Sequence, residues 1–235
     1  MNPDPKDDPS ASGRAAIAVD LVVFAIIDSE LKVLLNQRER QPFKGTWSLP
    51  GGFVRIADGP GQGESLGDSA RRHLAERTGL PEGHGHLQQL STFGRAGRDP
   101  RTRVIAVSWC ALLPPAAAAS VQSETLQWFS VTDETPWMRL AFDHAEIMAS
   151  GVERIQADLD RNTIAFELVP STFTVGELRS VYEAIQGRTH DARNFRRRFQ
   201  RLTQEGIVEQ APGKRHLGKS RPAMVWRLVR GQPAG

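Results

Sequence analysis

The sequence predicts an α/β (α+β) fold in two parts: a sandwich of mixed sheet and helices over residues 15–165, then a small helical domain with a β-hairpin over 166–235. Three observations support this: β-branched runs alternate with helical patterns in the first part, two helical patterns and two short strands make up the second, and the charge changes sign between them. Residues 1–170 hold 17 Lys and Arg against 22 Asp and Glu, whereas residues 171–235 hold 13 against 5. Such segregation is typical of a body that carries a basic module for a polyanion.

Composition restricts the class of protein further. Hydrophobic residues make up 39% of the 235 residues and charged residues 24%, which is ordinary for a soluble globular protein. The single cysteine, Cys110, lies in an apolar run and is expected to be a buried structural thiol, which suits a reducing compartment. Residues 1–14 are polar and rich in Pro and Asp, so we expect disorder there, and we find neither a signal peptide nor a membrane segment. A cytoplasmic protein without a membrane partner is the expectation.

The first domain is expected to open with a β-hairpin. The apolar, β-branched runs 15–27 and 31–38 flank the turn-like DSE. Residues 47–54 then add a short strand around a Gly-Gly pair. The composition of residues 56–63, rich in Gly, Pro and Asp, predicts a flexible loop.

A helix of about four turns follows this loop. Leu66, Ala70 and Leu74 recur at helical spacing after Glu64 and Ser65, and Gly79 provides the stop. Three further strands are expected at 87–94, 103–114 and 125–131, and an alanine- and proline-rich loop at 114–120 separates the last two. A helix at 143–160 completes the domain.

The second domain begins in the connector 166–172. Helical patterns over 174–187 and 191–206 each end at a glycine, and the short strands 207–210 and 223–229 flank a basic loop. Two helices joined by a tight turn and followed by a basic hairpin form the layout of a winged helix-turn-helix domain.

The second of these helices has one apolar and one basic face. Phe195, Phe199 and Leu202 share the apolar face. Arginine and amide side chains opposite it suit the major groove of DNA, and a basic hairpin loop suits phosphates or the minor groove. The candidate DNA contacts are Arg193, Asn194, Arg196, Arg197 and Gln200 on the helix and Lys214, Arg215, Lys219 and Arg221 in the loop.

Other interpretations of this basic face are weaker. A charged helix face without a partner is the usual explanation of a single cluster, but here the helix pair, the basic hairpin and the charge segregation coincide. The basic region has no aromatic platform of the kind that readers of single-stranded RNA use. Binding to double-stranded DNA is therefore the favoured prediction.

The first domain carries a motif that resembles the Nudix box. The stretch GGFV and then GESLGDSARRHLAERTGL match its pattern at Glu64, Arg72, Leu74, Glu76, Gly79 and Leu80, after a loop roughly six residues longer than the pattern. With WSLPGG upstream and WFSV downstream, the resemblance spans nearly all of residues 15–160 and implies a Nudix-like fold.

Two of the three expected metal-binding acids are replaced. In a working Nudix site, carboxylates at i, i+3 and i+4 hold Mg²⁺ on one helix face, but here those positions carry His73, Glu76 and Arg77. A nitrogen donor and a fixed cation suit Mg²⁺ poorly, so we expect no metal site, with Glu64 and Glu76 as vestiges. Arg77 either pairs with Glu76 or a neighbour on the helix surface, or replaces the metal charge and binds a nucleotide diphosphate.

Other residues on the Nudix frame are candidates for an effector pocket. Arg98, Arg101 and Arg103 in the segment RDPRTR could reach a phosphate or form a solvated loop, and Trp47 and Phe93 could stack on an adenine or belong to the core. His144 is expected to pack or cap near its helix start, where Asp143 is a plausible N-cap. The expected effector-binding residues are Trp47, Gly51, Gly52, Phe53, Arg77, Phe93, Arg98 and Arg103.

Taken together, the two domains resemble the Nudix-related transcriptional regulators of the NrtR type. The segments FTVGELRSVYEAIQGRTHDARNFRRRF and GKRHLGKSRPA look like that family's DNA-binding region. The resemblance implies a homodimeric repressor of bacterial NAD-biosynthesis or salvage genes that binds operator DNA. It also implies that a NAD-related nucleotide such as ADP-ribose binds as effector, without hydrolysis and without a required cofactor. Whether the nucleotide strengthens or weakens operator binding, as a corepressor or an inducer, is left open. The alternative is a Mg²⁺-dependent hydrolase of ADP-ribose or a related nucleoside diphosphate that uses Glu64 and Glu76.

Overall fold

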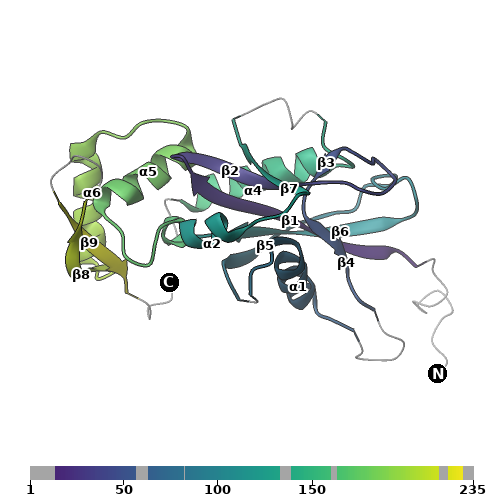
Figure 1. The fold of residues 1–235 in the computed structure, drawn as a ribbon, viewed down its shortest axis with the longest axis horizontal. Coiled ribbons are helices and arrows are strands. Elements are labelled where there is room, and N and C mark those ends of the chain that lie inside the picture. Colours follow the sequence, from purple (N-terminus) through teal and green to yellow (C-terminus); the bar gives the residue numbers. More distant parts are fainter. Residues whose placement is uncertain are drawn as a thin grey trace, which may run out of the picture.

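The structure is a computed structural model that describes residues 14–56, 63–81, 83–132, 139–159, 163–216 and 222–229. The expected disordered start, most of the loop at 56–63 and the candidate DNA contacts Lys219 and Arg221 lie outside these residues. Figure 1 shows a mixed sheet with its helices at one end of the molecule and the helices and hairpin of the second domain at the other. The expected architecture, a sandwich of mixed sheet and helices followed by a small domain of two helices and a hairpin, is confirmed.

Strand β1 (Ala16–Ile27) lies at the centre of the first domain's sheet. It pairs along one side with the parallel strand β6 (Val104–Leu112), and on the other side with the antiparallel strands β2 (Glu30–Gln37) and β4 (Gly51–Phe53). The predicted hairpin between β1 and β2 turns at Asp28 and Ser29, which have φ of 55° and 63°, the left-handed pair that suits a tight hairpin.

The remaining strands lie outside these. Strands β3 (Trp47–Ser48) and β7 (Leu126–Ser130) both pair with β2, while β5 (His86–Phe93) pairs with β6. The single strand expected over 47–54 is therefore wrong: its halves pair with different neighbours and Pro50, which has no N–H to donate, lies between them. Gly51 must be a glycine because an added Cβ would lie 2.1 Å from the Val19 carbonyl oxygen on β1.

Helices cover both faces of the sheet (Figure 1). Alternate residues of β1 point to opposite faces, so that Leu21 packs with α1 (Leu66–Thr78) and Val22 with α4 (His144–Asp158). Helix α1 starts at Ser65, whose hydroxyl caps the Asp68 N–H, and ends at Gly79 with φ of 72°, as predicted. The expected alanine-rich loop is instead the short helix α2 (Pro115–Ser120), because proline suits a first helical turn and alanine favours helix.

The second domain has the predicted helix pair and hairpin. After the 3-10 turn η2 (Ile164–Leu168) come α5 (Val175–Gln186), α6 (Ala192–Gln204) and the antiparallel strands β8 (Val208–Arg215) and β9 (Ala223–Leu228). Thr174 and Glu177 form a reciprocal capping box at the start of α5. Strand β8 runs five residues further than the predicted 207–210, because its pairing with β9 resumes beyond an irregularity after Gln210.

The two domains share one hydrophobic core. Ile155 and Leu159, at the end of α4, belong to the same buried cluster as Val181 and Ile185 of α5. Hydrogen bonds reinforce this junction: the Gln156 side chain donates to the Ile185 carbonyl at 3.0 Å, and the hydroxyl of Tyr182 on α5 donates to the Leu159 carbonyl at 3.1 Å. Helix α5 is thus packed on the first domain. None of the described helices is long and apolar enough to cross a membrane.

Candidate functional site

A cavity of about 500 Å³ opens where β1, β4, the end of β2 and the start of α4 come together. This volume is in the range that holds a nucleotide-sized ligand. Of the expected effector-binding residues, Gly51, Gly52, Phe53, Arg77 and Arg98 line it.

Trp47, Phe93 and Arg103 are placed outside the cavity lining. The Trp47 ring packs edge-on against Phe129 with centroids 4.8 Å apart, and Phe93 packs partly buried against the core. The Arg103 guanidinium donates to the Arg95 carbonyl at 3.2 Å. The two aromatic residues therefore follow the core alternative.

The floor of the cavity is a buried ion-pair network. Arg98 donates through Nε to Asp143 Oδ2 at 2.8 Å and through Nη2 to Asp20 Oδ2 at 3.0 Å. Burial acts to lower the pKa of Arg98, but the bonds from these two carboxylates outweigh it and raise the pKa. The expectation of Arg98 as a free phosphate contact is corrected, because two acids already compensate its charge. The Asp143 carboxylate accepts these bonds from Arg98, and its side chain makes no capping hydrogen bond to α4.

His144 completes the floor in a structural role, as expected. Its Nδ1 accepts the Leu49 N–H at 2.8 Å, and burial lowers its pKa, which keeps the ring neutral. Because Nδ1 accepts a hydrogen bond, the single proton of the neutral ring is on Nε2, which lies 3.6 Å from Asp20 Oδ1. His144 thereby joins the loop before β4 to the start of α4.

The wall of the cavity carries cations and aromatic rings. Arg77 donates from Nη2 to the Gly51 carbonyl at 3.2 Å, and the Arg38 guanidinium stacks 4.7 Å from the centre of the Phe142 ring. The Arg101 guanidinium lies 5.6 Å from the Phe53 ring and is paired with Asp99. Sequence reasoning missed Arg38 and Phe142, since they come from loops far apart in the chain, and no local motif links them.

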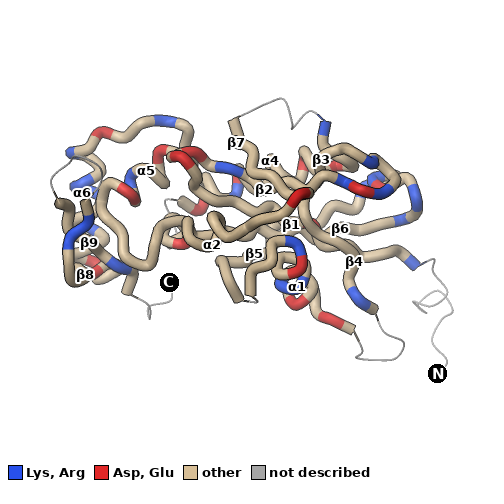
Figure 2. The backbone as a smooth tube through the Cα atoms, viewed as in Figure 1, with Lys and Arg blue, Asp and Glu red and all other residues tan. Residues whose placement is uncertain are grey.

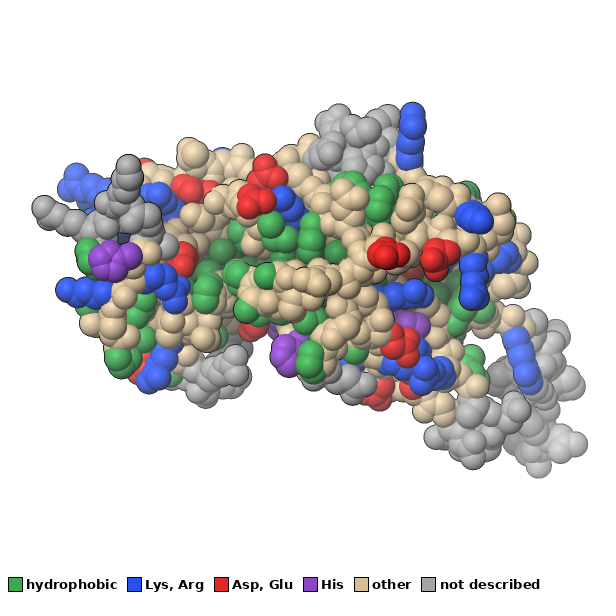
Figure 3. Space-filling view, viewed as in Figure 1, with side chains coloured by type: hydrophobic (Ala, Val, Ile, Leu, Met, Phe, Trp, Pro, Cys, Tyr) green, Lys and Arg blue, Asp and Glu red, His purple; other side chains and the backbone are tan. Residues whose placement is uncertain are grey.

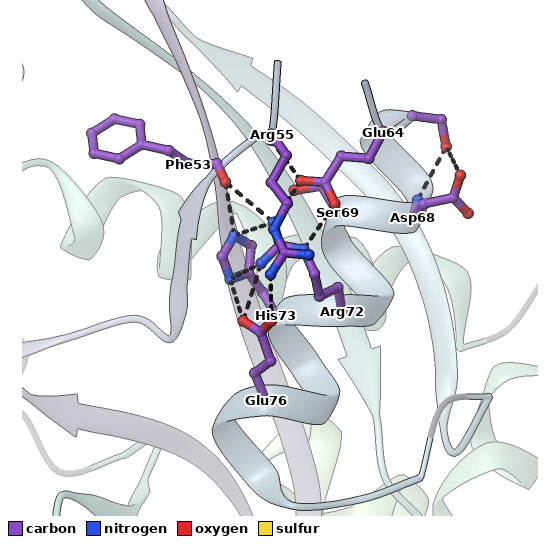
Figure 4. A network of polar contacts seen from close by, with 9 residues as sticks. Phe53, Arg55, Glu64, Asp68, Ser69, Arg72, His73 and Glu76 are labelled. Atoms are coloured by element: carbon purple, nitrogen blue, oxygen red, sulfur yellow. Dashed lines mark hydrogen bonds and ion pairs between the residues drawn. The ribbon is translucent and has the colours of Figure 1, made fainter. Parts of the chain in front are cut away.

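The Nudix-box residues form a closed polar network beside this wall (Figure 4). Arg72 donates from Nε to Glu64 Oε2 at 2.8 Å and from Nη1 to Glu76 Oε2 at 3.0 Å, and Glu76 also pairs with Arg55 at 3.1 Å. The hydrogen bond from Arg72 is the main cause that lowers the pKa of Glu64 to about 2. The expected pair between Arg77 and Glu76 is thus replaced: Glu76 pairs with Arg55 and Arg72, and the Arg77 guanidinium donates to the Gly51 carbonyl.

His73 is a buried part of the same network. Its Nε2 lies 3.1 Å from the Phe53 carbonyl, and its ring packs on Gly52, where an added Cβ would come within 2.4 Å of Cε1. Burial lowers the pKa of His73, so the ring is neutral near pH 7. Within the described part of the chain, no three His, Cys, Asp or Glu side chains cluster as a metal site would require.

A candidate nucleic-acid interface lies at the other end of the molecule. Helix α6 buries Phe195 and Phe199 and begins at Asp191, whose carboxylate accepts the Asn194 N–H at 2.8 Å. The five candidate DNA contacts on this helix are all exposed: Arg193, Asn194, Arg196, Arg197 and Gln200. Lys and Arg residues recur along α6 and the β8–β9 hairpin at this end (Figure 2), and side chains of these types are exposed there (Figure 3).

The hairpin residues are placed differently from one another. Lys214 is exposed, as a phosphate contact requires. Arg215 instead donates from Nη1 to Glu177 Oε1 at 2.8 Å and from Nη2 to the Thr172 carbonyl at 2.9 Å. Arg215 is held in this ion pair because β8 continues to Arg215 and brings it against the start of α5, and its role as a DNA contact stays a prediction.

These features define a class of protein, a Nudix-type domain with a cationic cavity joined to a winged-helix domain with a basic recognition helix. Residues 17–150 match the family described as NUDIX domain, and residues 165–228 match the NrtR DNA-binding winged helix domain. The chain is 33% identical over 215 residues to the ADPR responsive transcriptional repressor NtrR of Acinetobacter baylyi, covering 91% of this chain and 82% of that protein. The chain belongs to the NrtR family of Nudix-related transcriptional regulators.

Solved structures give the same result. NrtR of Shewanella oneidensis complexed with a 27mer DNA has a TM-score of 0.73 at 32% identity, covering 91% of this chain and 93% of that one. The Nudix domain of the same protein complexed with ADP ribose has a TM-score of 0.50 at 34% identity, covering 63% of this chain and 93% of that one.

A second relative by sequence is an enzyme. An ADP-ribose pyrophosphatase of Methanocaldococcus jannaschii is 32% identical over 134 residues, which cover 57% of this chain and 70% of that protein.

Proposed function

We propose that this protein is a homodimeric repressor that binds operator DNA through α6 and is controlled by ADP-ribose, or a related NAD-derived nucleotide, bound in the Nudix cavity. The observation that carries the proposal is the exposed basic face of α6 on a helix pair whose core is continuous with that of the cavity-bearing domain. The similarity to an ADPR responsive repressor, and to an NrtR complexed with DNA, supports it. Its regulated genes, on the family resemblance, are those of NAD biosynthesis or salvage.

The DNA-binding part is tested by one substitution on α6. Arg197 is exposed, with Phe195 and Phe199 buried on the opposite face, so that its guanidinium is free to reach a base or a phosphate. Arg197→Ala is expected to weaken operator binding by about 1 to 3 kcal/mol in fluorescence anisotropy. Arg71→Ala, which removes an exposed cation from α1, serves as the control. Equal affinity of the Arg197 variant and the wild type would refute the assignment of α6 as the recognition helix.

The effector and the dimer are tested together. A dimer with this motif must match half-sites about one turn of DNA apart, so a ligand that shifts the two winged helices changes operator affinity. ADP-ribose and then NAD are titrated into the protein–operator complex. We expect one of the two nucleotides to raise or lower the affinity of the protein for the operator. Sedimentation of the complex gives the number of chains bound. Nucleotide binding without any change in operator affinity would contradict the proposed control.

Hydrolysis of ADP-ribose is the second candidate function, favoured by the similarity to an ADP-ribose pyrophosphatase and by the presence of Glu64 and Glu76. Against it, both carboxylates are held by arginine side chains and two of the three box acids are absent. We propose that the protein does not turn over its effector. Release of AMP from ADP-ribose with Mg²⁺, abolished in Glu76→Gln, would establish the enzyme instead.

A further inference from the structure

The Nudix frame implies Mg²⁺ at the box residues, and the donors present do not fit it. The Glu64 and Glu76 carboxylates each accept hydrogen bonds from Arg72, and Glu76 accepts another from Arg55 (Figure 4). Mg²⁺ requires several oxygen ligands in near-octahedral arrangement, and two carboxylates that are already neutralised by guanidinium groups are poor ligands.

The replaced box positions remove further ligands. His73 is buried, with its Nε2 at the Phe53 carbonyl and its Nδ1 3.4 Å from Arg72 Nη1, so that neither nitrogen faces the cavity as a free donor to a metal. Arg77 brings a positive charge to the position where a third carboxylate would stand. Its guanidinium would repel a divalent cation on this face of α1.

The cavity wall has positive charge of its own. Arg77 and Arg38 line the cavity, and the hydrogen bonds they donate go to the carbonyls of Gly51 and Pro42. Within the described residues, neither forms an ion pair with a carboxylate, whereas Arg98 and Arg101 both do. Burial, and then the nearby Arg101 guanidinium, lower the pKa of Arg38, and the Asp99 and Asp20 carboxylates offset this only in part.

We infer that the cavity binds the diphosphate of its nucleotide without a divalent cation, with the guanidinium groups of Arg77 and Arg38 providing the positive charge that a metal provides in a Nudix hydrolase. This inference rests on the proposed effector function and specifies its chemistry. Guanidinium groups bind phosphate oxygens through paired N–H donors, so two arginines match the two charges of a diphosphate. The Phe142 ring lies against Arg38 and the Phe53 ring against Arg101, and both rings line the cavity, where they offer apolar surface to the rest of the nucleotide.

The test is calorimetric titration of the full-length protein with ADP-ribose, once in excess EDTA and once in Mg²⁺. We expect dissociation constants that agree within about twofold, because no metal takes part. Arg77→Gln is expected to weaken binding at least about tenfold in both buffers, and Arg77→Lys less, because lysine keeps the charge but not the paired donors. Arg71→Gln on the same helix is the control, and thermal melting verifies that each variant is folded.

The outcomes separate this inference from the function on which it rests. Binding that is lost in EDTA and restored by Mg²⁺ would overturn the metal-free site while leaving ADP-ribose as the effector. An Arg77→Gln variant with wild-type affinity would overturn the role of Arg77. Failure of ADP-ribose to bind in either buffer would contradict both the inference and the proposed effector.

Discussion

At the scale of single residues, the degenerate Nudix box is a structural unit. Arg72 joins Glu64 to Glu76, and His73 fills the space above Gly52, where even a methyl group would collide with its ring. A carboxylate in place of His73 would have to be buried beside the Phe53 carbonyl, where two oxygen atoms face each other. The changes at the box therefore replace metal coordination with hydrogen bonds between side chains.

This network makes Glu64 a source of acid sensitivity. Its folded pKa of about 2 lies below the ordinary value of 4.5, so its contribution to stability is complete above pH 4.5 and is lost as the pH falls from 4.5 towards 2. Glu64→Gln should therefore lower the free energy of unfolding by urea at pH 7, and the difference from wild type should shrink below pH 4.5. Glu124→Gln, at an exposed position, is the control. A difference that stays constant from pH 7 to pH 3 would rule out this linkage.

At the scale of elements, the bond between Arg215 and Glu177 fixes the hairpin to the first turn of α5. Arg215 contacts both Glu177 and Thr172, and Glu177 also caps the N–H of Thr174. The side chains are 30% and 24% exposed, so solvent only partly screens this pair. The hairpin position relative to α6 thus depends on a contact within the domain.

Two substitutions separate this positioning role from direct phosphate binding. Glu177→Gln keeps the capping box but breaks the ion pair, and Arg215→Met removes the cation. If Arg215 positions the hairpin, both variants should weaken operator binding by a similar factor, roughly threefold to tenfold, with an unchanged salt dependence. If Arg215 binds a phosphate, only Arg215→Met should weaken binding, and it should reduce the slope against log salt by about 1. Anisotropy titrations at several salt concentrations distinguish the two.

At the scale of the whole molecule, α4 connects the cavity to the winged helix. Its first residue, His144, lies in the cavity floor, and its last turns pack against α5, where Gln156 and the Leu159 carbonyl hydrogen-bond to that helix. Figure 1 shows α4 between the sheet and the second domain. A nucleotide that moves the floor therefore has a packed route to the DNA-binding domain, because helices transmit displacement along their length.

This arrangement predicts that the junction governs coupling. Gln156→Ala removes the hydrogen bond from α4 to the Ile185 carbonyl and leaves the cavity and α6 side chains intact, whereas Tyr182 is kept because its hydroxyl also accepts a hydrogen bond from Arg198 of α6. The Gln156→Ala variant should bind ADP-ribose and operator separately as the wild type does, while the factor by which one changes the affinity for the other falls about threefold or more. Glu153→Ala, exposed on the same helix, is the control. An unchanged coupling factor would show that the signal takes another route.

Much of this protein was determined by local sequence. The caps at Ser65 and Thr174, the hairpin at Asp28 and the charge change near residue 170 are local signals, because a cap or a tight turn depends on residues within one or two turns of chain. The Nudix box and the basic face of α6 could also be predicted from residues close in the chain, because fixed spacing on a helix decides which side chains share a face.

Only the tertiary structure decided which charges are free. Arg98 and Arg215 are neutralised by acids distant in the chain, whereas Arg38, in the loop after β2, and Arg77, on α1, both line the cavity. The split of 47–54 into β3 and β4 depended likewise on two different partner strands. Electrostatic compensation and strand pairing are set by distance in space, which no local pattern of residues encodes.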